Sequence, residues 1–170
     1  GLMVMTKTNR AGLKALAEVS GAEISSINET DLGFKLGPRL NAAGRLAHAQ
    51  KALDLLTTND IETAKTIAID LNQLNSERQA ATKQIFEEAN EQAKKYKSDP
   101  ILVLHSPDWS HGVVGIVASK VSEKWHKPVI ILQELESGAK GSARSFGSFN
   151  IVEAIADSAE LMQSYGGHAY

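Results

Sequence analysis

The feature that most constrains the fold is the stretch 59–97, which contains neither proline nor glycine. Apolar or small side chains recur along it at steps of mostly three and four, so they share one face of a helix. Asn59 and Glu62 stand three residues apart, which is the spacing of a capping box at a helix start. The pattern predicts one long amphipathic helix with apolar positions at Ala64, Ile67, Leu71, Leu74, Ala81, Ile85, Ala89 and Ala93.

A helix over residues 59–97 would be roughly 55 Å long, which exceeds the diameter of a small domain. We therefore expect this helix to connect two bodies. The alternative is a coiled-coil dimer, and this interpretation is weakened by the polar residues Asn75 and Arg78, which interrupt the apolar face.

The residues before the long helix predict a helical region with breaks. Residues 9–20 have apolar residues at helical spacing, and Gly21 follows where a helix commonly ends. Residues 25–30 are typical of a loop that leads into a new helix. We expect Pro38 and the glycines around it to interrupt the next segment, with a helical pattern resuming from Ala47.

After Pro100 the pattern changes to alternating strands and helices, which predicts an α/β fold with a mixed sheet. Short apolar runs are typical of buried strands, and longer runs with helical spacing separate them. The expected elements are a strand at 101–104, a helix at 112–126, a strand at 128–132, a turn at 137–141, a strand at 141–146 and a helix at 151–163 capped by Asn150.

The composition excludes several classes of protein. The net charge of the 170 residues is −2, so any binding of nucleic acid must come from a local basic patch. The absence of cysteine excludes a disulfide scaffold and a thiolate zinc site, and it fits a reducing cytoplasm. No apolar run approaches the roughly 18 residues that span a membrane. Because the chain starts with glycine and stops in a glycine-rich turn, we expect it to be a piece of a longer polypeptide.

The first candidate site is a basic segment between Leu32 and Leu53, which has four cationic side chains and no carboxylate, a local charge of about +4. Arginine suits phosphate because its planar guanidinium donates two hydrogen bonds at once. The alternative is a solvated basic face at a helix start. The cationic residues are Lys35, Arg39, Arg45 and Lys51.

The second candidate site is the segment from Gly141 to Ser145, in which two hydroxyls flank Arg144. Arg144 could neutralise a phosphate while the hydroxyls and main-chain N–H groups donate to it. An ordinary edge strand with small residues is the alternative.

The third candidate site is the turn that contains Gly166, Gly167 and His168. An imidazole there could contact a phosphate or a metal-bound water, although a lone histidine after two glycines often has no such role. The carboxylates of the chain do not cluster, and we find no sequence motif for a two-metal centre.

These motifs, in this order, resemble those of the RecJ-type exonucleases of the DHH phosphoesterase superfamily. The resemblance covers nearly the whole chain and rests on GPRLNAAGRL, WSHGVVGIVASKVSEKWHKPVIIL, GSARSFGSFNI and GGHAY. One departure is Trp109-Ser110-His111, where the family often has Trp-His. We therefore give His111 no role. We expect Trp109 to lie in the core, with stacking on a base as the alternative.

The resemblance implies three parts: residues 1–57 as the C-terminal part of a DHH domain, 58–97 as a connecting helix, and 98–170 as a truncated DHH-associated domain. It also implies a cytoplasmic, metal-dependent 5′→3′ exonuclease that acts on single-stranded DNA in repair and recombination. Its Mn²⁺ or Mg²⁺ ions would be held by the full-length parent, and we expect none bound by this chain. Helicases or single-strand-binding proteins are possible partners of the parent, and no membrane is expected.

The resemblance assigns no catalytic residue to this chain, apart from a possible role for His168 near the metal site. Two alternatives stay open: a DHH-family phosphodiesterase for oligonucleotides or dinucleotides, and a non-catalytic nucleic-acid-binding module. The residues implied to bind substrate phosphate or DNA are Arg39, Asn41, Arg45, Ser142, Arg144, Ser145, Gly166, Gly167 and His168.

Overall fold

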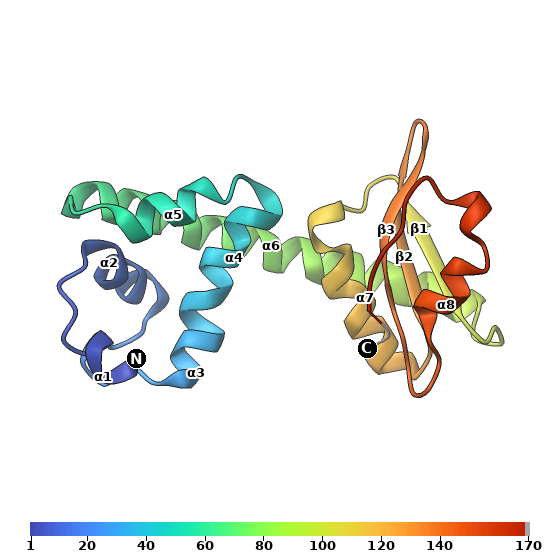
Figure 1. The fold of residues 1–170 in the computed structure, drawn as a ribbon, viewed down its shortest axis with the longest axis horizontal. Coiled ribbons are helices and arrows are strands. Elements are labelled where there is room, and N and C mark those ends of the chain that lie inside the picture. The colour runs from blue at the N-terminus through green and yellow to red at the C-terminus, as the bar shows by residue number, and fades with distance from the viewer. Residues whose placement is uncertain (169–170) are drawn as a thin grey trace. The chain divides into compact units, whose positions relative to one another are not determined.

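The structure is a computed structural model that describes residues 1–168. It contains two compact units, and the boundary between them falls after Ala80, inside the long helix α6 (Ile61–Lys95). Figure 1 shows the course of the chain and the labels of its elements. Within the described residues, no helix is both long and apolar enough to span a membrane.

The first unit is entirely helical. Helix α2 ends at Gly21, whose φ of 66° places it in the left-handed region, as predicted from the sequence. A capping box closes the start of α3, where the side chain of Asn28 accepts from the Asp31 N–H. The elements are α1 (Leu2–Met5), α2 (Ala11–Ser20), the 3₁₀ turn η1 (Ile24–Ser26), α3 (Glu29–Asp31), the π-helical turn η2 (Leu32–Leu36), α4 (Gly37–Leu46), α5 (Gln50–Thr57) and the first part of α6.

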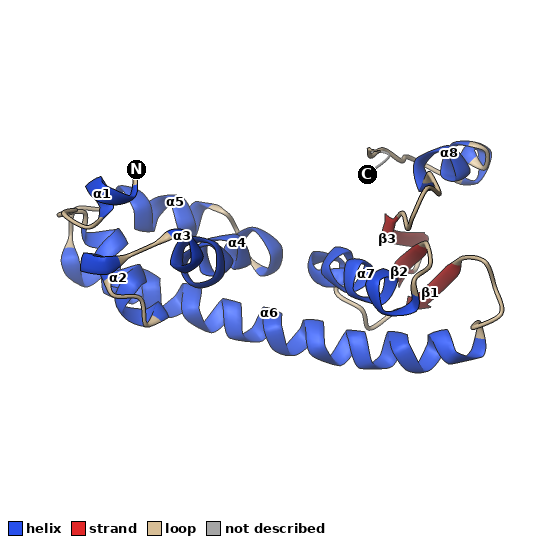
Figure 2. Ribbon diagram, turned by 90° about the horizontal axis from the view of Figure 1, so that it is seen from below, coloured by secondary structure: helices blue, strands red, loops and turns tan. Residues whose placement is uncertain are grey.

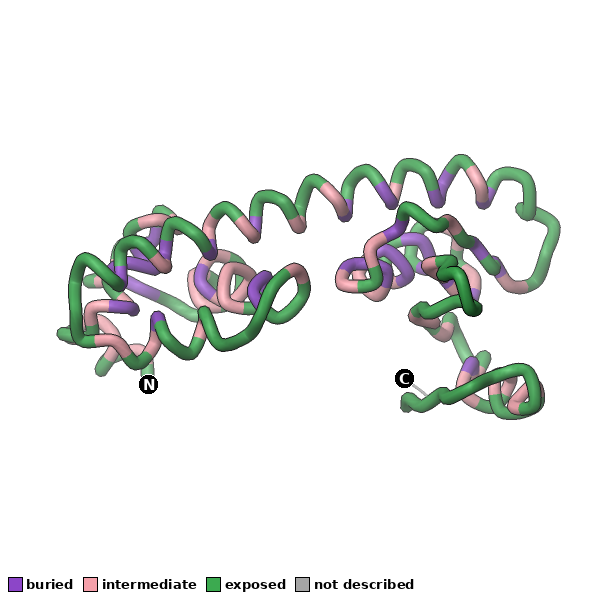
Figure 3. Tube along the Cα trace, turned by 90° about the horizontal axis from the view of Figure 1, so that it is seen from above, coloured by how far each residue is buried: buried purple, intermediate pink, exposed green. Residues whose placement is uncertain are grey.

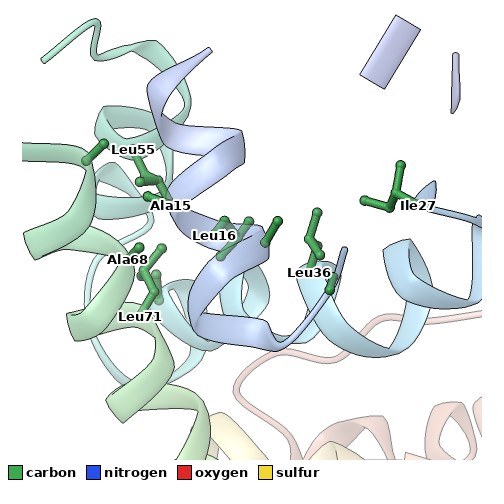
Figure 4. Close-up of a cluster of buried hydrophobic side chains, with 11 residues drawn as sticks. Ala15, Leu16, Ile27, Leu36, Leu55, Ala68 and Leu71 are labelled. Carbon is green, nitrogen blue, oxygen red and sulfur yellow. The ribbon is translucent and has the colours of Figure 1, made fainter. Parts of the chain in front are cut away.

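The core of this unit is formed by side chains from α2, η2, α5 and α6, as Figure 4 shows. Leu16, Leu55 and Leu71 are fully buried in it. Helices α2 and α5 approach closely because Gly12 has no side chain, and a Cβ there would lie 1.8 Å from the Leu55 carbonyl oxygen.

The expected interruption around Pro38 is wrong, because α4 runs unbroken from Gly37 to Leu46. Proline is tolerated there because it occupies the first turn of the helix, where little is lost by the absence of its N–H. The break comes later, at Ala47, whose φ of −142° and ψ of −133° end the helix before α5 begins.

The long helix predicted from the sequence is confirmed as α6, although its cap differs from the prediction. The carboxylate of Asp60, and not the side chain of Asn59, accepts the N–H of Thr63 at 2.7 Å. Figure 3 shows buried positions recurring along one side of this helix. They are Ala64, Ala68 and Leu71 in the first unit, and Ile85, Ala89 and Ala93 in the second.

The second unit is an α/β layer around a mixed sheet, as expected (Figure 2). The sheet order is β1-β2-β3, with β1 and β2 parallel and β2 and β3 antiparallel. The parallel pair is connected through α7, a crossover typical of a βαβ unit. The elements are β1 (Leu102–Ser106), α7 (His111–Trp125), β2 (Val129–Leu135), β3 (Gly138–Arg144), α8 (Ile151–Ala156) and the 3₁₀ turn η3 (Ala159–Leu161).

Several boundaries in this unit differ from the sequence prediction: β1 continues to Ser106 and β2 to Leu135, beyond their expected ends at 104 and 132, and β3 ends at Arg144 instead of 146. Strand β3 begins at Gly138 and not at 141, because Leu135 pairs with Gly138 and a turn of only two residues separates the strands. Helix α8 is capped by Asn150 as predicted, but it ends at Ala156 instead of continuing to 163.

The second half of α6 is tied to this layer by polar contacts of two tryptophans. Trp109 donates from Nε1 to Glu88 at 2.8 Å, and Trp125 donates from Nε1 to Asn90 at 2.9 Å. Trp109 is only 2% exposed, which confirms the prediction of a core tryptophan. These contacts explain why residues from 81 onward belong to the α/β unit.

Candidate phosphate-binding site

Strand β3 and helix α7 bring basic and hydroxyl-bearing side chains together. Alternate residues of a strand share one face, so Ser142 and Arg144 point the same way. They meet α7 at Gly115 and Ser119, which are one helical turn apart. We call this region the β3–α7 junction. It comprises Lys140, Ser142 and Arg144 on β3 and His111, Gly115 and Ser119 on α7.

The guanidinium of Arg144 is held in place by neutral oxygens. Its Nε donates to Ser119 Oγ at 2.8 Å, while Nη1 donates to Ser142 Oγ at 3.1 Å and to the Ala143 carbonyl at 2.6 Å. The Ser119 hydroxyl in turn donates to the Gly115 carbonyl at 3.2 Å. Arg144 is thus oriented and still exposed, the state in which a guanidinium can receive an anion.

The charge of the β3–α7 junction is not balanced by carboxylates. Among residues 1–168, no ion pair is formed by Arg144 or Lys140. Burial, followed by the positive charge of Lys140, lowers the pKa of His111. The two side chains therefore lie close enough to interact electrostatically. An uncompensated positive field of this kind favours an anionic ligand.

Glycines at the junction are required by close packing. A Cβ at Gly141 would lie 2.1 Å from the Ile131 carbonyl oxygen, so β2 and β3 could not keep their distance with a side chain there. A Cβ at Gly115 would lie 3.2 Å from Ser142 Oγ. Gly141 therefore sets the distance between β2 and β3, and Gly115 allows Ser142 and Arg144 to approach α7 closely.

Ser145, the second hydroxyl of the predicted motif, supports the main chain that follows β3. Its Oγ accepts the N–H of Ile151 at 3.3 Å, and its carbonyl accepts the hydroxyl of Ser122 at 3.4 Å. The side chain thereby anchors the connection between β3 and α8. A role in phosphate binding stays a prediction.

Arg39, in the first unit, joins three helical elements. Its Nε donates to Asn72 at 2.9 Å and its Nη1 donates to the Lys35 carbonyl at 2.7 Å. Burial lowers the pKa of Arg39. These contacts fasten α4 to η2 and α6, so part of its hydrogen-bonding capacity serves the fold.

The predicted local charge of about +4 around α4 is partly compensated in the structure, which corrects the count made from the segment alone. Lys35 pairs with Asp31 at 2.7 Å, and Lys51 pairs with Asp70 of α6 at 2.9 Å. Both ion pairs lower the positive field that a phosphate would meet. Two of the four cations in this segment are therefore paired, and phosphate binding by the segment stays a prediction.

Asn41 and Arg45 lie one turn apart on α4, and both are exposed. The charge of Arg45 contributes, after burial, to a lowered pKa of Arg78 on α6. The two guanidinium groups therefore lie near each other within the first unit. Arg78 was not among the predicted site residues, because the sequence shows it only as an interruption of an apolar stripe.

The Gly166-Gly167-His168 segment is exposed and passes along α8. A Cβ at Gly167 would lie 3.4 Å from Val152 Cγ2. Within residues 1–168, no described hydrogen bond or ion pair joins this segment to the β3–α7 junction. The role of His168 near a metal site stays a prediction, and Ala169 and Tyr170 of the same motif lie outside the described residues.

A metal centre is not supported by the residues that the structure describes. Residues 1–168 contain no group of three or more histidine, cysteine or carboxylate side chains placed to hold an ion. A two-metal hydrolase needs several such ligands around ions about 3.5–4 Å apart. The side chains of the described residues therefore do not fit Mn²⁺ or Mg²⁺.

Comparison with known proteins indicates the family to which this chain is similar. A model of the DHHA1 domain matches residues 98–170. The single-stranded-DNA-specific exonuclease RecJ of Bacillus subtilis is 40% identical over 171 residues, covering 99% of this chain and 22% of the relative. RecJ of Haemophilus influenzae is 36% identical over 180 residues, covering 99% of this chain and 31% of the relative. The chain thus spans less than a third of either relative.

Solved structures agree with the sequence comparison. The crystal structure of RecJ from Thermus thermophilus in complex with Mn²⁺ matches with a TM-score of 0.87 and 34% identity, covering 99% of this chain and 25% of that chain. The same protein in complex with Mg²⁺ matches with a TM-score of 0.82 and 33% identity, over 99% of this chain and 26% of that one. By sequence and by fold, the chain belongs to the RecJ family.

Proposed function

We propose that this chain is the substrate-binding part of a single-stranded-DNA-specific exonuclease, and that Arg144 holds a phosphate of the DNA. The observation that carries the proposal is an exposed guanidinium, fixed by two serine hydroxyls, on a face without a carboxylate partner among the described residues. The names of the relatives supply the substrate class.

The chemical contribution of Arg144 is binding and charge neutralisation. A guanidinium already held at Nε and Nη1 does not need to reorganise when a phosphate arrives, which is the condition for strong electrostatic stabilisation. Holding the phosphodiester in a fixed position also lowers the entropy cost of bringing the reacting groups together. In this proposal, hydrolysis depends on metal ligands that a longer enzyme supplies.

The remaining assignments of the resemblance are part of the same proposal. Residues 1–57 would belong to a DHH domain, α6 would be the connecting helix, and Asn41 and Arg45 would meet the DNA from the first unit. Helicase or single-strand-binding partners, action in DNA repair and a cytoplasmic location remain predictions for the longer enzyme.

The test is a fluorescence-anisotropy titration of the 170-residue chain with a 5′-phosphorylated single-stranded oligonucleotide and with the same sequence as a duplex. We expect tighter binding to the single strand. Arg144→Ala should weaken that binding about tenfold to a hundredfold, as for loss of a charge-assisted contact.

The matched control is Lys95→Ala, which removes an exposed positive charge at the end of α6, outside the β3–α7 junction. It should change the affinity little. Equal losses in Arg144→Ala and Lys95→Ala, or no loss in either, would contradict the proposal, because binding would then depend on net charge or on another surface.

A further inference from the structure

The β3–α7 junction continues beyond Arg144 to a second cation. Lys140 has the same strand parity as Ser142 and Arg144, so it lies on the same face of β3. The register pairs Lys140 with Gln133 of β2, and the Gln133 side chain accepts the main-chain N–H of His111 at 3.2 Å. This arrangement places Lys140 beside the first residue of α7.

The side chains on the facing sides of β3 and α7 are spaced at similar intervals. Two residues of a strand cover about 6.6 Å and four residues of a helix cover about 6 Å, so a strand step of two matches a helix step of four. Arg144 therefore faces Ser119, Ser142 faces Gly115, and Lys140 faces His111.

The row is too long for one phosphate. From Lys140 to Arg144 the strand covers about 13 Å, whereas neighbouring phosphates of one stacked strand are separated by about 3.4 Å along the axis. A phosphate at Arg144 would leave Lys140 to meet a different phosphate of the same strand. Lys140 is exposed and, within residues 1–168, forms no ion pair that would compete.

We propose that Lys140 and His111 form a second phosphate subsite, which binds an internal phosphodiester of the strand whose other phosphate is held by Arg144. The inference rests on the proposed function. It adds the path of the DNA backbone, which runs along β3 from Arg144 towards Lys140. The subsite accepts a phosphodiester of any sequence, because contacts of cationic side chains with phosphate carry no sequence information.

The test separates the two subsites by substrate length. Isothermal titration calorimetry would compare thymidine 5′-monophosphate with 5′-phosphorylated thymidine oligonucleotides of two, three, four and six residues, using the wild type, Lys140→Ala, Lys140→Arg, Arg144→Ala and Lys95→Ala. The mononucleotide carries one phosphate and can fill only one subsite at a time, and we expect this to be the Arg144 subsite because hydrogen bonds already orient that guanidinium.

Lys140→Ala should leave the affinity for the mononucleotide unchanged and weaken binding of the longer oligonucleotides about threefold to fivefold, the effect of an exposed ion pair. Lys140→Arg should restore the affinity. Arg144→Ala should weaken binding at every length.

Two results would overturn the subsite: no effect of Lys140→Ala at any length, or an equal loss for the mononucleotide and the longest oligonucleotide, which would indicate a diffuse field. Neither result would contradict the proposal that Arg144 holds a DNA phosphate. Failure of the proposed function has a different signature, in which Arg144→Ala binds every ligand as the wild type does.

Discussion

Arg144 and Ser119 are joined across the junction of β3 and α7 by a hydrogen bond of 2.8 Å from Nε to Oγ. Ser119 thereby fixes the guanidinium, so we expect its effect to be on orientation. We predict that Ser119→Ala weakens single-stranded DNA binding several-fold, or by about 1 kcal/mol, because Nη1 of Arg144 keeps its hydrogen bonds to Ser142 and to the Ala143 carbonyl. The measurement is the anisotropy titration. A loss as large as that of Arg144→Ala would show that Ser119 does more than orient the guanidinium.

Gly141→Ala should damage both the fold and the site. The added Cβ would meet the Ile131 carbonyl at 2.1 Å and Leu132 Cδ2 at 2.6 Å, so β2 and β3 must separate. We expect a loss of about 1–3 kcal/mol in the free energy of unfolding, as for overpacking, together with weaker DNA binding. Urea denaturation measures the first effect. Gly33→Ala is the control, because nothing lies within 4 Å of its Cβ, and it should not destabilise the protein.

The side-chain amide of Gln92 pairs with the main chain of the edge strand β1. It accepts the His105 N–H at 2.9 Å and donates to the His105 carbonyl at 3.0 Å, as a neighbouring strand would. Gln92→Leu should therefore destabilise the second unit by about 1–2 kcal/mol, because two main-chain groups lose their partner. Gln73→Leu, which removes only a contact between the exposed side chains of Gln73 and Glu77, should have little effect in the same denaturation experiment. Equal stabilities of the two variants would contradict this account.

The pH dependence of DNA binding should reveal His111. Its pKa is lowered by burial and then by Lys140, while the other facing groups, Gln133 and Gly115, are uncharged. A bound phosphodiester favours the protonated imidazole, so affinity should rise as the pH falls through and below about 6.5, the ordinary value for histidine. The oligonucleotide must lack a terminal phosphate, which itself titrates near about pH 6.

Without DNA, the same shift acts on stability with the opposite sign. Between the lowered pKa of folded His111 and about 6.5, the unfolded chain binds the proton more readily, so the folded state loses stability as the pH falls through this window. His111→Gln should flatten both pH profiles. A binding profile that matches that of the wild type would show that His111 does not face the bound phosphate, and a matching stability profile would contradict the lowered pKa of His111.

Much of the fold could be predicted from the sequence, because the elements concerned carry strong local signals. The absence of proline and glycine over 59–97 was sufficient for α6, and the apolar runs were sufficient for β1 and β2. Helix α4 was missed because Pro38 was treated as a breaker, although a helix tolerates proline in its first turn.

The sites were less predictable, because their neighbours come from distant parts of the chain. Asp70, which compensates Lys51, lies on another helix and outside any local count of charge. Ser119 and Arg144 are separated by a whole strand and a hairpin, and only the sheet register brings them together. Arg144 itself could be proposed from its motif, whereas Ser119, His111 and Lys140 required the structure.

The most direct test of the account is the salt dependence of single-stranded DNA binding by this chain and its Arg144→Ala variant. Each phosphate neutralised on a single strand contributes about −0.7 to the slope of log K against log salt concentration. We predict that Arg144→Ala makes the slope shallower by about 0.7 and weakens binding at every salt concentration, while Lys95→Ala changes neither. An Arg144→Ala variant with the slope and affinity of the wild type would contradict the claim that this arginine holds a DNA phosphate.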